Sequence, residues 1–233
     1  MIANALRLEI ERYAARMPSH NPLFKKAEDG TFTAASMVRY LTNVRYLCFE
    51  AQGYLDRAGA RALELGDVAL AEHYANKRRE ERGHEEWADR DIERVTSTAP
   101  VPLPVGIVPA IDGLLAFLRR SIDEDPAFYL SYILFSEYLI VLLGTPWLLL
   151  LEERCGIPRT SMTIVGNHIE LDREHVVEAL DDIDALVGDP AKLPRMREAL
   201  LATFAHFDAF CEEVTQGSAA DSSQDALRQI SAA

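Results

Sequence analysis

Three residues of metal-ligating type stand at helical spacing in the segment GNHIELDREHVVEAL, residues 166–180. His168, Asp172 and His175 occupy positions i, i+4 and i+7, which a helix with 3.6 residues per turn places on one narrow stripe. The segment also carries apolar positions, so the stripe borders a face that needs burial. The pattern predicts either a polar outer face or half of a metal site, and the motif alone favours neither.

A second pair lies in the charge-rich segment KRREERGHEEWADRD, residues 77–91. Glu81 and His84 stand at i and i+3, a spacing by which helical bundles direct two ligands inward. Taken alone, the pair is better explained as solvated surface, because most of its neighbours are charged. Gly83 inside a helix costs about 1 kcal/mol relative to alanine, so it predicts a close approach of another helix beside His84.

Glu137 is the only charged residue between Pro126 and Glu152. A buried carboxylate must be paired, protonated or bound to a cation. An ion pair with an arginine is the alternative, but two histidine-containing groups are available to share a metal with Glu137. The surrounding segment is long enough to span a bilayer; Glu137 and Pro146 within it favour instead the central helix of a bundle.

Carboxylate and imidazole are the ligand types of non-haem iron and manganese, whereas zinc more often recruits cysteine. The sequence therefore predicts two irons per chain, with manganese as a substitute. Glu137 is expected to bridge them and to take part in catalysis. One metal is assigned mainly to the Glu81–His84 pair, and the other or both to the stripe. The six predicted metal ligands are Glu81, His84, Glu137, His168, Asp172 and His175.

The helical periodicity of apolar residues, together with capping residues and the glycines and prolines that end helices, predicts an all-α bundle of about seven helices and no strands. Residues 1–215 are predicted to form one helical domain, and the small and polar residues 216–233 a C-terminal tail. The expected helices cover residues 3–17, 33–65, 67–95, 110–122, 126–155, 161–187 and 192–215.

Composition limits the partners and the compartment. The chain has 233 residues, 48% of them hydrophobic, and a net charge of −13, which argues against nucleic acid and against an anionic membrane. Its three cysteines are far apart and form no CxxC pair, which suggests a reducing compartment rather than a disulfide framework. The N-terminus carries charges throughout and does not have the pattern of a signal peptide, so a cytoplasmic location is expected. A small-molecule substrate and dioxygen are the expected partners, and a homodimer is compatible with the sequence.

These motifs resemble those of the haem-oxygenase-like di-iron oxidases and oxygenases. That superfamily includes an olefin-forming fatty-acid decarboxylase, N-oxygenases of amino-acid nitrogen and a chlamydial protein that makes p-aminobenzoate. The resemblance covers about residues 3–210. It rests on H-x3-D-x2-H at 168–175, on Glu137 placed 31 positions before His168, and on His84 placed 53 positions before Glu137. It implies a helical bundle of this fold, which TenA- and PqqC-like proteins share, and oxidation of a small organic substrate by N-oxygenation, desaturation or C–C cleavage.

One position departs from this resemblance. Several members have a glutamate seven residues before the histidine of the third helix, where this chain has Lys77. Glu81 is assigned the role instead, and Glu50 is held in reserve. Lys77 also supports the alternative of a metal-free, TenA-like bundle that binds a ligand. Aromatic and aliphatic residues around Glu137 suit an apolar substrate group, and arginines are candidates for holding a substrate carboxylate: Arg39, Arg45 and Arg78.

Overall fold

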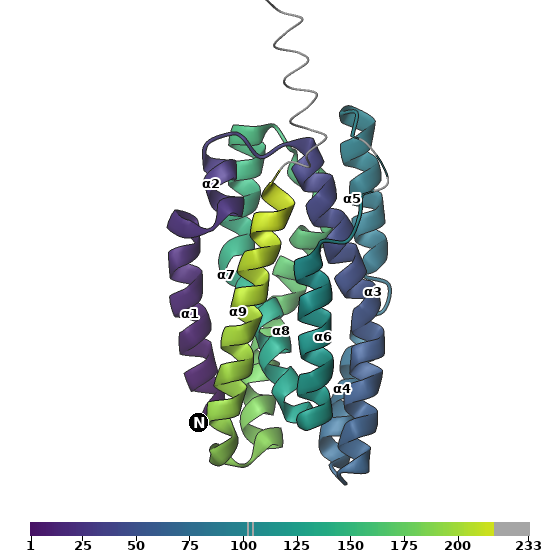
Figure 1. The fold of residues 1–233 in the computed structure, drawn as a ribbon, viewed down its shortest axis with the longest axis vertical. Coiled ribbons are helices and arrows are strands. Elements are labelled where there is room, and N and C mark those ends of the chain that lie inside the picture. Colours follow the sequence, from purple (N-terminus) through teal and green to yellow (C-terminus); the bar gives the residue numbers. More distant parts are fainter. Residues whose placement is uncertain (102, 104, 217–233) are drawn as a thin grey trace, which may run out of the picture.

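The computed structural model describes residues 1–101, 103 and 105–216, which form an elongated, all-α bundle (Figure 1). Within these residues no strand occurs, which confirms the predicted fold class. Three short 3-10 helices, η1 (Pro126–Phe128), η2 (Arg159–Ser161) and η3 (Pro190–Lys192), connect longer elements. The α-helices are α1 (Ile2–His20), α2 (Pro22–Glu28), α3 (Ala34–Glu64), α4 (Val68–Glu80), α5 (Glu85–Thr98), α6 (Pro109–Glu124), α7 (Tyr129–Cys155), α8 (Thr163–Val187) and α9 (Leu193–Thr215).

Several helix ends follow directly from residue type. Thr33 caps α3 by accepting a hydrogen bond from the Ser36 amide, and Asp67 caps α4 in the same way. At their C-terminal ends, α7 and α8 stop at Gly156 and Gly188, which both have positive φ angles of +67° and +62°. These predicted boundaries are therefore confirmed.

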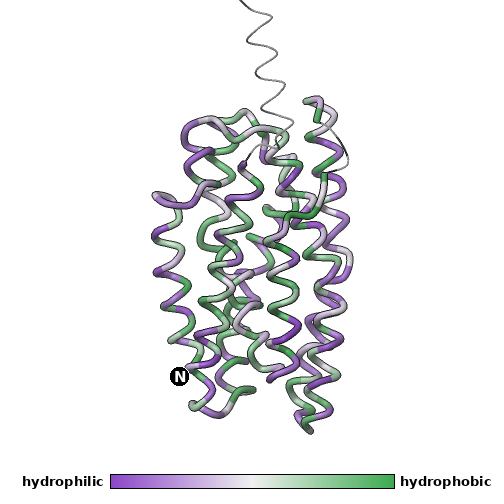
Figure 2. The backbone as a smooth tube through the Cα atoms, in the orientation of Figure 1, coloured by the Kyte–Doolittle hydropathy of each residue, from purple (hydrophilic) through white to green (hydrophobic). Residues whose placement is uncertain are grey.

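Helix α7 is the central, mostly apolar helix of the bundle. It packs against α8, α1, α2 and α9, and hydrophobic residues concentrate in the middle of the molecule, while the outer helices alternate in hydropathy (Figure 2). Within the described residues, Pro126–Cys155 is the one segment long and apolar enough to cross a membrane, a criterion that the core helix of a water-soluble protein also meets. Burial of Glu137 within it fits the core-helix interpretation.

The helix count and three predicted elements differ from the structure. The first helix was predicted to end at residue 17, before Pro18, but α1 continues through Pro18 to His20. Nine α-helices form in the described part of the chain, rather than about seven. Residues 22–28 were predicted as loop, but they form α2, because the Asn21 side chain accepts from the Leu23 amide and Pro22 suits a first helical turn. The predicted helix over 67–95 is two helices, α4 and α5, separated by a turn. Residues 217–233 lie outside the described residues, so the tail and the domain boundary stay predictions.

Candidate metal centre

The turn between α4 and α5 brings two of the predicted ligands together. Glu81 is the C-cap of α4 and His84 the N-cap of α5. Gly83 between them has a φ of +88°, a conformation that residues with a side chain rarely adopt. A Cβ atom at Gly83 would meet no heavy atom within 4 Å. The prediction of a close helix approach there was wrong, and the turn itself explains the glycine.

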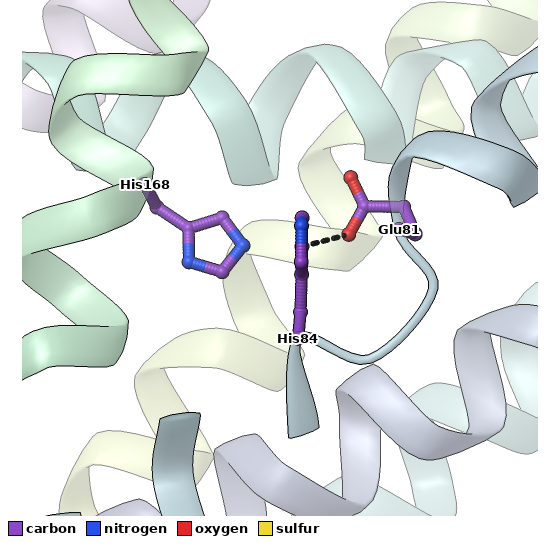
Figure 3. A group of neighbouring side chains, drawn as sticks. All are labelled: Glu81, His84 and His168. Atoms are coloured by element: carbon purple, nitrogen blue, oxygen red, sulfur yellow. Dashed lines mark hydrogen bonds and ion pairs between the residues drawn. The ribbon is translucent and has the colours of Figure 1, made fainter. Parts of the chain in front are cut away.

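His168 of α8 completes a group that we term the two-histidine cluster: Glu81, His84 and His168. One potential ligand atom from each lies within 4.8 Å of the others. His84 Nδ1 is 3.0 Å from Glu81 Oε2, and Figure 3 shows the imidazole of His168 reaching toward this pair from the opposite side. Elements far apart in the sequence thus place one carboxylate and two imidazoles around a common point.

Hydrogen bonds set the protonation pattern of this cluster. His168 Nδ1 lies 2.7 Å from the Ile164 carbonyl oxygen, which only accepts, so Nδ1 carries the proton. In a neutral imidazole this leaves the Nε2 lone pair free for a metal. Burial opposes ionisation of Glu81, but its hydrogen bond with His84 and the nearby positive charge of Lys77 act in the opposite direction, and the pKa of Glu81 is lowered. The donor set therefore fits a divalent metal ion.

Two further residues hold the imidazoles in place. Trp87 stacks on the His84 ring at a centroid distance of 4.2 Å and meets the His168 ring edge-on at 5.5 Å. Asp91 of α5 is fully buried and accepts hydrogen bonds from the Ile164 amide and the Thr163 hydroxyl, both at 2.8 Å. Asp91 thereby caps the first turn of α8, whose own N-cap residue makes no side-chain cap. Sequence reasoning missed both, although they follow His84 at the helical spacings of three and seven.

A glycine of α7 sets the distance to α8. A Cβ atom at Gly144 would lie 2.7 Å from the side chain of Ile169, which is closer than real carbon atoms approach. Ile169 directly follows His168, so α7 and α8 pack closely beside this potential ligand.

The remaining predicted ligands form a separate group, the two-carboxylate cluster: Glu137, Asp172 and His175. Their potential ligand atoms also lie within 4.8 Å of one another. His175 Nδ1 is 3.2 Å from Asp172 Oδ1 and 4.0 Å from Glu137 Oε1. The hydrogen bond to Asp172 raises the pKa of His175 despite burial and the nearby Lys77. The structure thus divides the predicted stripe, with His168 in one cluster and Asp172 and His175 in the other.

Lys77 enters the two-carboxylate cluster as its cation. Its Nζ lies 2.9 Å from Glu137 Oε1 and 3.3 Å from Glu80 Oε2, and only 4% of the residue is exposed. Burial raises the pKa of Glu137 to about 7, and the ion pair with Lys77 only partly opposes this. The second oxygen of Glu137, Oε2, is buried without a hydrogen-bond partner in the described structure. Glu137 thus forms an ion pair, as the alternative interpretation stated, but its partner is a lysine and not the expected arginine.

Both clusters border one elongated cavity of about 240 Å³. Glu81, His168, Glu137 and Asp172 line it together with Lys77. Trp147 also lines it, ten positions after Glu137 on α7, so the cavity follows that helix for about 15 Å at 1.5 Å per residue. Its wall is otherwise largely apolar and aromatic, including Met17, Phe24, Tyr40, Tyr132 and Phe207.

The reserve ligand and the expected carboxylate-binding arginines lie elsewhere. Glu50 lines a separate hollow with Tyr46 and Arg119. Arg45 pairs with Asp89, and Arg78 pairs with Asp56 at 2.7 Å. Arg39 donates to the carbonyl oxygens of residues 214 and 216. None of these residues lines the cavity in the described structure, so the three candidate arginines do not border the space available to a substrate there.

Solved structures with the same fold place the chain among known architectures. A domain of unknown function with a haem oxygenase-like fold from Shewanella denitrificans is 18% identical, with a TM-score of 0.78 over 91% of this chain and 90% of that one. A CADD-like protein of unknown function from Nostoc punctiforme is 16% identical, with a TM-score of 0.67 over 92% and 97%. A TenA homolog from Pseudomonas syringae is 16% identical, with a TM-score of 0.65 over 93% of each chain.

The chain therefore has the haem-oxygenase-like fold, as the resemblance in its motifs implied. No protein-family model matches the sequence. No curated protein matches it either. At these identities the structural likeness shows the fold alone, and the chemistry has to be argued from the site.

Proposed function

We propose that this chain is a non-haem iron oxidase or oxygenase that activates dioxygen to oxidise a small, largely apolar organic substrate. The observation that carries the proposal is the position of the two-histidine cluster at the wall of the apolar cavity. A carboxylate with two imidazoles is the ligand set of many non-haem Fe(II) oxygenases, and manganese can substitute in such sites. The cavity supplies room for a substrate beside it.

Iron bound there would supply the activation of dioxygen. The chain's own residues would hold Glu81, His84 and His168 in position, through the Ile164 carbonyl and Trp87. The apolar wall would exclude water and orient the substrate along α7. Glu137 has a free, buried oxygen at this wall and a pKa of about 7. This supports its predicted role as a catalytic residue, which would accept or hold a proton there.

The test is iron binding and dioxygen consumption. The purified chain is loaded with ferrous iron without oxygen, and dioxygen uptake is then followed with fatty acids and hydrophobic amines as substrates. We expect Glu81→Gln to lose most bound iron and all iron-dependent uptake. Glu50→Gln is the matched control, because it makes the same change in the separate hollow. Equal iron content in both variants would remove Glu81 from the site.

A second candidate function is a metal-free bundle that binds an apolar ligand. The Lys77–Glu137 ion pair favours it, because Glu137 has a cation without any metal. Nucleophilic catalysis by a thiol in the cavity is not supported, because burial raises the pKa of Cys48, which lines the cavity, to about 12. A chain that takes up no iron after anaerobic loading, but still binds apolar ligands, would establish this alternative.

A further inference from the structure

We propose that the chain binds a single metal ion in the two-histidine cluster, and that the ammonium group of Lys77 takes the place of a second one. The inference rests on the proposed function, because it states how many ions that function uses. It departs from the sequence prediction of two irons, and it follows from the different surroundings of the two clusters.

The two-histidine cluster is sufficient as a metal site by itself. One carboxylate and two imidazoles form the facial triad that holds a single iron and leaves other coordination positions open. Glu81 and His168 both line the cavity, so those open positions would face the space available to a substrate. Within the described residues, the hydrogen-bond partner of the Glu81 carboxylate is His84, a member of the same cluster.

The two-carboxylate cluster already has its own positive charge. Glu137 accepts a hydrogen bond from the Lys77 ammonium at 2.9 Å, and Asp172 is 3.2 Å from His175 Nδ1. Each carboxylate therefore has a donor of its own. A divalent ion beside Glu137 would stand close to the ammonium, and the two positive charges would repel each other in a buried environment.

Lys77 would not leave this position readily. Its side chain is 6% exposed, and that of Glu137 is 7% exposed, so separating the two would leave buried charges without partners. Glu80 holds the ammonium from a second direction at 3.3 Å. The sequence has a lysine where the resemblance implies a ligating glutamate, and the structure shows this lysine acting as the counter-ion of Glu137.

The test is the number of ferrous ions that the full chain retains after anaerobic loading and removal of excess iron. We expect about one ion per chain for the wild type and for Lys77→Arg, which keeps the positive charge. We expect about two for Lys77→Glu, because this change replaces the cation by a further carboxylate ligand. Helical content, measured by circular dichroism, shows whether each variant is folded.

His175→Ala supplies a second measurement that does not depend on the folding of Lys77→Glu. If one ion is bound by the two-histidine cluster, His175→Ala should retain the wild-type iron content. A wild-type chain with two ions that loses one in His175→Ala would overturn the inference but leave the proposed function intact. Lys77→Glu that folds without gaining an ion would also overturn it. A wild-type chain without bound iron would overturn the proposed function itself.

Discussion

The two clusters contain the same kinds of side chain, carboxylates and imidazoles, but the groups beside their buried carboxylates differ. In the two-carboxylate cluster, Lys77 pairs with Glu137, and the charges are compensated by the chain itself. In the two-histidine cluster, Glu81 faces imidazoles whose hydrogen bonds leave lone pairs available. Ligand-type residues alone therefore do not identify a metal site; the position of the nearest fixed cation distinguishes the two clusters.

The largest expected effect is loss of metal affinity in the two-histidine cluster. His168→Ala removes a direct ligand, so it should weaken ferrous iron binding on the order of 1000-fold, more than the ~10–100-fold typical of outer-shell partners. Isothermal titration without oxygen measures this affinity. His20→Ala removes an exposed imidazole at the end of α1 and is the control. Unchanged binding by His168→Ala would remove the distinction between the clusters.

Breaking the internal ion pair should affect stability instead. Lys77→Met leaves Glu137 without its cation, which should lower the free energy of unfolding by about 3 kcal/mol at pH 8. The double variant Lys77→Met/Glu137→Leu should recover most of this loss, because it removes both charges. Chemical denaturation of the wild type and both variants measures the difference. A double variant as unstable as Lys77→Met would show that the ion pair is not the cause.

The free energy of unfolding of Lys77→Met should also depend on pH, in a direction set by the pKa of Glu137. Without Lys77, the pKa of Glu137 in the folded chain should lie above its present value of about 7, whereas the ordinary value is 4.5. A carboxyl group whose pKa is raised on folding destabilises the folded state increasingly as pH rises between these values. The defect of Lys77→Met should therefore be smaller at pH 5 than at pH 8.

The packing that positions His168 predicts a smaller effect. Gly144→Ala places a Cβ atom against Ile169 and should cost about 1–3 kcal/mol of stability by overpacking. It should also weaken metal binding by displacing α8. Gly53→Ala, in α3, meets no atom within 4 Å and should stabilise the chain by about 0.5–1 kcal/mol. Thermal unfolding of the two variants compares these outcomes, and equal effects would contradict the role of Gly144.

The smallest expected effect comes from the turn between α4 and α5. Gly83→Ala forces a side chain into a left-handed conformation and should cost about 1–2 kcal/mol. Gly106→Ala, in a connecting segment with open space around it, is the control. A loss of iron affinity in Gly83→Ala, but not in Gly106→Ala, would show that the turn geometry serves the two-histidine cluster. Equal affinities would assign Gly83 to folding alone.

The sequence was sufficient to predict the helical class and most helix ends, because capping residues and glycines act locally, as at Thr33, Asp67 and Gly156. It also predicted that the six ligand-type residues would gather near one another, through periodicity and resemblance. It did not predict how these residues divide, because His168 lies with Glu81 and His84 rather than with Asp172 and His175. That division depends on the break at Gly83 and on where Lys77 points, and both are set by tertiary packing that spacing along a helix does not encode.

The cap that Asp91 provides has a consequence for how the molecule opens. The first turn of α8 obtains its hydrogen-bond acceptor from α5, so fraying of either element breaks the hydrogen bond between the Ile164 amide and the buried Asp91 side chain. The two should unfold locally as one cooperative unit, with similar rates of amide hydrogen exchange around residues 84–91 and 163–166. Because Ile164 lines the cavity, opening of that unit would also open the cavity wall at this position.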